Sequence, residues 1–173
     1  MIPVPSILVG YGRFAAARYN DHGEWIYTGE GMNSSMAVSK LWNGVLNYHN
    51  AGKVQASSEP QDMRLQRMLG HMTTLVPENP AKVLVIGMGA GVTAGAVSID
   101  PLVREQVIAE IEPLVPQVVS THFSEHNFDV VPEIHAQDDF WHRKYGEDEK
   151  GRAVRIAATE DVVQKGDATD VHL

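Results

Sequence analysis

The stretch AKVLVIGMGAGVTAGAVS, residues 81–98, decides the fold. Its apolar run VLVI, residues 83–86, is rich in β-branched side chains, which predicts a parallel strand buried on both faces. Three glycines, Gly87, Gly89 and Gly91, follow at once, and a helix is expected to begin directly after them. A strand that ends in a glycine turn and opens into a helix is typical of the first unit of a doubly wound α/β sheet.

An acidic residue lies where the partner of such a glycine turn is expected. A second strand is predicted over 106–111 and a second helix over 114–122, so that Glu110, 19 residues after Gly91, stands at the strand's end. Glycines let a nucleotide approach the backbone, and an acid at the neighbouring strand end can accept both ribose hydroxyls. The pattern therefore favours an adenosine-containing ligand without fixing the reaction.

Two other interpretations of the glycine turn stay open. GAGVTA, residues 89–94, also fits the dinucleotide fingerprint, which would place a pyrophosphate on the helix and indicate an NAD-dependent oxidoreductase. Its register is less favourable, because its first glycine lies two residues beyond the tight turn at Gly87. Alternatively, the turn only packs a helix on a strand and holds no ligand.

The chain divides into three parts by composition. Residues 1–60 alternate between polar and apolar side chains and carry glycine and asparagine turns, which predicts a small N-terminal β region. Residues 61–131 are expected to form a nucleotide-binding α/β half-domain. Residues 132–173 are polar and divergent and are expected to form a poorly ordered tail, with one strand expected over 154–157. The fold class that follows is α/β, a small β region followed by a partial doubly wound, Rossmann-like sheet.

A helix is expected between the β region and the first parallel strand. It begins near Pro60 and ends before Pro77. Four apolar residues at helical spacing are predicted to form its core face: Met63, Met68, Leu69 and Met72.

Composition excludes several function classes. The chain has 173 residues, a formal net charge of −8 and no cysteine. An acidic chain without a basic stripe is not expected to bind nucleic acid. The absence of cysteine excludes disulfides, a thiol nucleophile and cysteine-bound metals. The apolar runs are too short to cross a bilayer, so we expect a soluble, cytoplasmic protein.

Two groups of residues have the chemistry of metal ligands. His122 and His126 are spaced i, i+4 on an expected helix. A second group crowds into a charged loop: His135, Asp138, Asp139 and His142. Neither group completes a ligand motif, so both are interpreted as surface residues and no metal is expected.

Two segments carry a resemblance to a known family. GKVQASSEPQDMRLQRMLGH, residues 52–71, and VLVIGMGAGVTAG, residues 83–95, are its most specific parts, and the likeness extends over about 11–131. The chain resembles the polyamine aminopropyltransferase (spermidine synthase-like) family. The resemblance implies a class I methyltransferase-like fold that binds decarboxylated S-adenosylmethionine, or S-adenosylmethionine itself. It also implies transfer of an aminopropyl group to an amine or polyamine, with release of methylthioadenosine.

The resemblance implies binding roles for individual positions. Gly87, Gly89 and Gly91 would form the nucleotide loop, and Glu110 would hold the ribose. Gln55 falls where the family places a glutamine near the active site. The adenine-contacting acid would be imitated by the Asp138-Asp139 pair or by Asp167.

The chain also departs from the family pattern. Ala90 stands where the glycine loop of the family carries an aspartate that faces the amine. Leu65 and Gln66 replace a Tyr-His pair, and Ser34 replaces a glutamine that contacts the thioadenosine. The strand with the catalytic aspartate, the general base, cannot be recognised after Pro132, so the catalytic residue stays unassigned and a truncated or frame-shifted chain is the hypothesis.

The function expected from the sequence is a spermidine synthase-like transferase. The alternatives are a non-catalytic nucleoside-binding relic or dimerisation module and, less favoured, an S-adenosylmethionine methyltransferase or the NAD-dependent oxidoreductase. A half sheet leaves an open strand edge and apolar surface, so a homodimer is expected.

Overall fold

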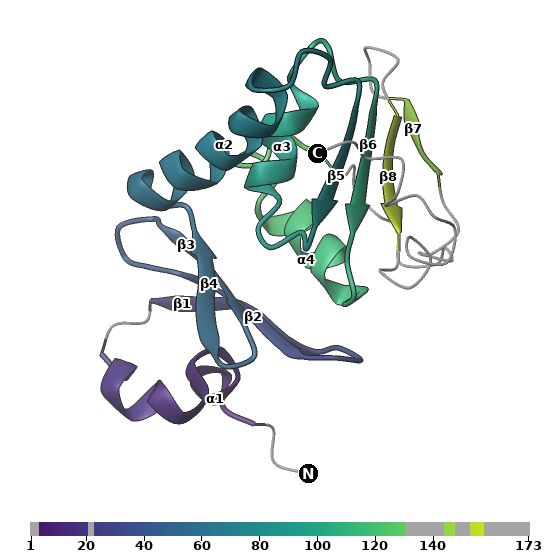
Figure 1. Ribbon diagram of the computed structural model, residues 1–173. Coiled ribbons are helices and arrows are strands. Elements are labelled where there is room, and N and C mark those ends of the chain that lie inside the picture. Colours follow the sequence, from purple (N-terminus) through teal and green to yellow (C-terminus); the bar gives the residue numbers. More distant parts are fainter. Residues whose placement is uncertain (1–3, 21–22, 131–143, 148–152, 158–173) are drawn as a thin grey trace. The chain divides into compact units, whose positions relative to one another are not determined.

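A computed structural model describes residues 4–20, 23–130, 144–147 and 153–157. The chain divides into two compact units, Met1–Met63 and Arg64–Leu173, and the boundary falls within helix α2 (Figure 1). In the described part of the chain, no helix combines the length and the apolar character that a membrane crossing requires.

Unit 1 combines a short helical segment with an antiparallel sheet. Its four strands hydrogen-bond in the order β1-β2-β3-β4. The elements, in chain order, are α1 (Ser6–Tyr11), the 3-10 helix η1 (Gly12–Arg18), β1 (Glu24–Glu30), β2 (Ser35–Lys40), β3 (Leu46–Asn50) and β4 (Lys53–Ser57). Ala51 and Gly52 both have positive φ, as a two-residue hairpin turn between β3 and β4 requires.

The sequence did not predict the helices of unit 1. Only strands were expected over 1–60, whereas α1 and η1 occupy Ser6 to Arg18. The reason is tertiary packing, because α1 is too short for an amphipathic pattern. A Cβ on Gly10 would overlap the Trp25 ring, and the Tyr11 ring meets His49 edge-on, with 4.9 Å between ring centroids. These contacts fix α1 on the sheet.

Unit 2 is an α/β unit with a mostly parallel sheet. The strand order is β5-β6-β8-β7, in which β5–β6 and β6–β8 are parallel and β7–β8 is antiparallel. The elements are α2 (Pro60–Leu75), β5 (Lys82–Ile86), α3 (Val92–Ser98), β6 (Glu105–Ala109), α4 (Leu114–His122), β7 (Lys144–Glu147) and β8 (Ala153–Ala157). The expected α/β fold, with a small β region first, is confirmed, and so is the strand expected over 154–157.

The core of unit 2 lies between the parallel strands and their helices. Val97 of α3 packs with Val83 of β5 and with Val103. Gln106 is a buried polar residue inside β6. Its Nε2 donates to the Ala94 carbonyl at 3.0 Å, while its Oε1 has no hydrogen-bond partner in the part of the chain that the structure describes. Strand β6 ends at Ala109, two residues before the predicted end, and this leaves Glu110 just beyond the sheet.

The predicted core face of α2 was wrong in all but one residue. Met63 is buried, but Met68, Leu69 and Met72 are more than half exposed. The buried face instead carries Gly70 and Thr74. At Gly70 an added Cβ would lie 2.5 Å from the Thr93 carbonyl and 2.6 Å from the Ala96 Cβ, so α2 and α3 approach each other backbone to backbone.

Candidate functional site

The glycine turn after β5 has the backbone that its sequence requires. Gly87, Gly89 and Gly91 have φ values of 79°, 54° and 78°, in the left-handed region that residues with a Cβ rarely adopt. A Cβ on Gly87 or Gly89 would meet nothing within 4 Å, so both glycines border open space. A Cβ on Gly91 would press on Asn127 and Met88. Two of the three predicted glycines therefore offer open backbone, while the third serves packing.

Glu110 lies against this turn, as the sequence predicts. Its Oε2 accepts the Met88 N–H at 2.7 Å, and its Oε1 accepts the Glu112 N–H at 2.9 Å. A further bond from the Gly87 N–H to the Ala109 carbonyl, at 2.8 Å, joins the turn to the end of β6. Glu110 is 7% exposed, so the carboxylate is buried and held by two backbone donors. The structure thus brings the glycine turn and the acid together.

The acid after Glu110 has a structural role of its own. Glu112 is also buried, and its Oε1 accepts the Leu114 N–H at 3.1 Å at the first residue of α4. A carboxylate at a helix start satisfies a backbone donor that the helix itself cannot. Glu112 therefore fixes α4 to the strand end, and Glu110 is the carboxylate that borders the turn.

Sequence reasoning missed Asn127, whose buried side chain forms a hydrogen bond with the turn. Its Nδ2 donates to the Ala90 carbonyl at 3.3 Å, and its backbone would clash with a Cβ on Gly95. Asn127 is 1% exposed, and Phe128 and Asp129, which follow it, both have positive φ. No local signal could have identified it, because 37 residues separate Asn127 from its partner Ala90.

The position with the missing aspartate is closed to solvent. Ala90 is 1% exposed, so its methyl group is part of the core of the turn. A carboxylate at this position would have to be buried or would have to displace its neighbours. The structure accounts for alanine here as a packing residue.

Two exposed isoleucines at the carboxyl ends of the parallel strands were also not predicted. Ile86 is the last residue of β5, and Ile111 directly follows Glu110. Both are more than half exposed. The position of Ile111 next to the acid that follows β6 is a signal that could have identified it, whereas Ile86 was expected to be buried with the rest of its strand. Their side chains give this edge of the sheet an apolar surface beside the glycine turn.

The other predicted residues belong to unit 1, to α2 or to segments outside the described residues. Gln55 lies on β4 of unit 1, where it is exposed, and Ser34 directly precedes β2. Asp138 and Asp167 lie outside the described residues. Leu65 is exposed on α2, and Gln66 uses its carbonyl to accept the Thr93 hydroxyl at 3.1 Å. The roles of Gln55 and Asp138 stay predictions.

His122 and His126 were expected on one helix, but the structure does not place them on one. Helix α4 ends at His122, and His126 follows in the turns beyond it. Burial lowers the pKa of His122 because it disfavours the charged imidazolium, so the neutral imidazole is favoured. Across the ranges that the structure describes, no three histidine or acidic side chains come together as metal ligands. The residues His135, Asp139 and His142 lie outside those ranges.

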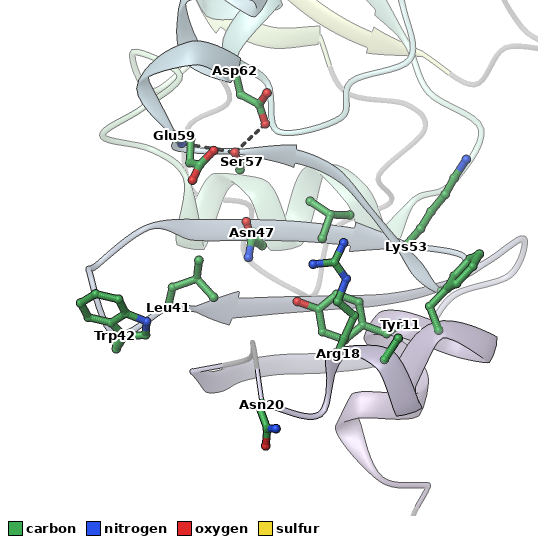
Figure 2. A pocket seen from close by; sticks show the side chains of 14 residues that line it. Tyr11, Arg18, Asn20, Leu41, Trp42, Asn47, Lys53, Ser57, Glu59 and Asp62 are labelled. Atoms are coloured by element: carbon green, nitrogen blue, oxygen red, sulfur yellow. Dashed lines mark hydrogen bonds between the residues drawn. The ribbon is translucent and has the colours of Figure 1, made fainter.

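A hollow of about 790 Å³ is confined to unit 1 (Figure 2). Arg18 and Lys53 contribute positive charges to its lining, and Glu59 and Asp62 contribute negative ones. At its acidic end the Ser57 hydroxyl donates to Asp62, in the first turn of α2, and accepts the Glu59 N–H just before that helix (Figure 2). Neither the glycine turn nor Glu110 contributes to this hollow.

Comparisons with known proteins agree on one group of relatives. Over 124 residues, 70% of its length, the chain is 30% identical to a polyamine aminopropyltransferase of Aeropyrum pernix, of which this match covers 39%. No protein-family model matches the chain.

Two solved structures share the fold. A spermidine synthase in complex with the transition-state analogue AdoDATO has a TM-score of 0.63 at 19% identity, over 83% of this chain and 44% of that one. The spermidine synthase of Thermotoga maritima has a TM-score of 0.61 at 18% identity, over 79% of this chain and 41% of that one. The chain thus spans less than half the length of each relative.

Proposed function

Because this chain is a relative of the polyamine aminopropyltransferases, we propose that its glycine turn and Glu110 bind the nucleoside part of an S-adenosylmethionine-type co-substrate. Decarboxylated S-adenosylmethionine and its product methylthioadenosine are the proposed ligands, with S-adenosylmethionine itself as the alternative. The observation that carries the proposal is the buried Glu110 carboxylate, which the backbone N–H groups of Met88 in the turn and of Glu112 hold in place.

The chemistry of the site suits an adenosine. Each carboxylate oxygen has capacity for a second hydrogen bond, so Glu110 can accept the two ribose hydroxyls while it keeps its backbone donors. Gly87 and Gly89 have no Cβ between the backbone and the ligand. Ile111 and Ile86 offer apolar surface to a purine ring. We expect no nucleic acid partner and no metal in this reaction, and we place the protein in the cytoplasm.

The proposed reaction is the transfer of an aminopropyl group to an amine. The amine nitrogen attacks the methylene carbon beside the sulfonium, the carbon–sulfur bond breaks, and its electron pair stays on the sulfur of methylthioadenosine. The amine must lose one proton to a base. Among the described residues we assign that role to none, since Ala90 is buried and without a carboxylate. We therefore propose the transfer on the similarity to the polyamine aminopropyltransferases alone, and we assign no catalytic base in this chain.

The test is a calorimetric titration of the chain with methylthioadenosine. We expect the Glu110→Gln variant to bind at least about tenfold more weakly, because it loses the charge that strengthens hydrogen bonds to the ribose. The matched control is Glu105→Gln, which changes an acid of β6 that pairs with Lys82 at the surface and should leave affinity unchanged.

A second variant separates binding from folding. Glu110 is buried and linked to Met88 and Glu112, so its substitution can also destabilise unit 2. Ile111 is exposed, and Ile111→Ser should weaken methylthioadenosine binding several-fold without lowering the melting temperature. If both variants bind as tightly as the unchanged chain, the ligand is held elsewhere and the proposal fails.

A further inference from the structure

A buried side-chain amide lies in the lining of the unit 1 hollow. Asn47 of β3 is 8% exposed, yet it is one of the residues that line the hollow (Figure 2). Among the described residues, no hydrogen bond engages its side-chain amide. A buried polar group without a partner is costly, and native proteins satisfy nearly all such groups. The Asn47 amide therefore points to a polar molecule that binds in the hollow.

The register of the sheet directs Asn47 toward the helical segment of unit 1. Side chains alternate between the two faces of a strand, so Asn47 shares a face with His49, whose Nδ1 bonds the Gly10 carbonyl of α1 at 3.0 Å. Ser57 pairs with Asn47 across β3 and β4 and lies beside it on that face. On its other side the hollow is lined by Arg18 of η1. The amide is therefore placed between a sheet and a helical segment.

Charges of both signs line the hollow and balance each other. Arg18 and Lys53 are positive, and we call Glu59 and Asp62, which are negative, the acidic end. Within the described part of the chain, no hydrogen bond or ion pair engages the Glu59 carboxylate. Arg18 and Asp62 have contacts of their own, but a guanidinium has five N–H donors and a carboxylate about four acceptor sites, so each can also hold a ligand. A ligand of one sign would meet like charge in this lining.

We propose that the hollow binds a small zwitterion, a free amino acid or a short peptide. The ammonium group of the ligand lies at the acidic end, and its carboxylate lies at Arg18, where a guanidinium can hold both oxygens. The Asn47 amide donates to the carboxylate or accepts an N–H of the ligand. Phe14 and Val54 line the hollow and are partly exposed, so they offer apolar surface to the body of the ligand. The volume of about 790 Å³ is in the range of small-molecule sites.

This site differs in its residues from the proposed nucleoside site. Its lining contains neither the glycine turn nor Glu110. It also lacks Gln55, the residue of β4 for which the family resemblance implies a place near the active site. The zwitterion proposal therefore does not depend on nucleoside binding, and either proposal can fail while the other holds.

The first test is a calorimetric titration of the full chain with L-phenylalanine and with trialanine. The two probes carry the same charged groups at different separations, so the tighter one distinguishes a free amino acid from a peptide. N-acetylation removes the ammonium charge and C-terminal amidation removes the carboxylate, and each should weaken the tighter probe at least about fivefold. Binding that survives the loss of either charge overturns the proposal, and so does the absence of binding by both probes.

The second test assigns each end of the ligand to a residue. In Glu59→Gln the penalty for acetylation should largely disappear, and in Arg18→Gln the penalty for amidation should do the same, because each variant has already lost that charge pair. Glu30→Gln is the matched control, since Glu30 is an exposed acid of β1 outside the lining. If acetylation costs as much in Glu59→Gln as in the unchanged chain, the ammonium is bound elsewhere and the proposal fails.

The third test concerns the buried amide. Asn47→Ala should weaken the tighter probe several-fold but should change the melting temperature little, because the side chain has no hydrogen bond to lose among the described residues. A variant that binds the probe as tightly as the unchanged chain would show that the amide does not contact the ligand, and it would overturn the proposed placement in the hollow.

Discussion

Helices α1 and α2 solve the same packing problem in opposite ways. Helix α1 of unit 1 inserts large rings into its sheet, where Tyr11 contacts both Trp25 and His49. Helix α2 buries Gly70 and Thr74 and leaves Met68, Leu69 and Met72 more than half exposed. The difference teaches that helical spacing tells which residues share a face, whereas the space available beside the helix decides which face is buried.

The largest effect is expected from removal of the ring that anchors α1. Tyr11 is buried, so Tyr11→Ala should lower the free energy of unfolding of unit 1 by about 3–5 kcal/mol, as for other buried aromatic truncations. Leu8→Ala, on the same helix but half exposed, should cost much less. Urea unfolding followed by tryptophan fluorescence measures both, because Trp25 and Trp42 lie in unit 1. Equal losses for the two variants would contradict the packing described for α1.

An intermediate effect is expected where α2 approaches α3. Gly70→Ala should destabilise unit 2 by about 1–3 kcal/mol through overpacking, although alanine is the better helix former by about 1 kcal/mol. Thr73→Ala, on an exposed position of the same helix, should stay within about 0.5 kcal/mol. Urea unfolding followed by far-UV circular dichroism measures the change. A stabilised Gly70→Ala variant would show that the two helices do not touch at this point.

The smallest effect is a pH dependence confined to unit 1. His49 is fully buried, donates from Nδ1 to the Gly10 carbonyl at 3.0 Å and accepts the Ser39 hydroxyl at Nε2, at 2.8 Å. Burial lowers its pKa, although the bond to Gly10 acts in the opposite direction. The folded unit therefore holds the neutral imidazole, and the unfolded chain takes up the proton first as the pH falls.

The sign of that dependence follows directly. The stability that neutral His49 contributes is complete above its unfolded pKa of about 6.5 and is lost as the pH falls toward the lower folded pKa. Urea midpoints for unit 1 should be lower at pH 5 than at pH 7.5. His49→Phe should flatten the curve, because the ring remains and the titrating group is gone. A His49→Phe variant with the same dependence would place its origin elsewhere.

The sequence predicted the parts of the site that are local. Strand, glycine turn, acid and helix follow one another between 82 and 122, and each carries its own signal. Glu110 reached the turn because parallel neighbouring strands end at the same edge of the sheet. Asn127 could not be predicted, since its contacts with Ala90 and Gly91 depend on how the chain after α4 returns to the turn. The buried face of α2 was predicted wrongly because the helical spacing of apolar residues shows that they share a face, but does not show whether that face is buried or exposed.

The contact at Gly70 also divides the positions of α2 by the kind of change that they tolerate. Folding of one chain depends on a position where hydrogen is the largest side chain that fits. The outer positions can exchange one large apolar residue for another at little cost to the stability of unit 2, because they are more than half exposed. Selection for a stable unit 2 would therefore conserve glycine at position 70. The outer residues of α2 could change more freely, within the limits set by anything that binds this face.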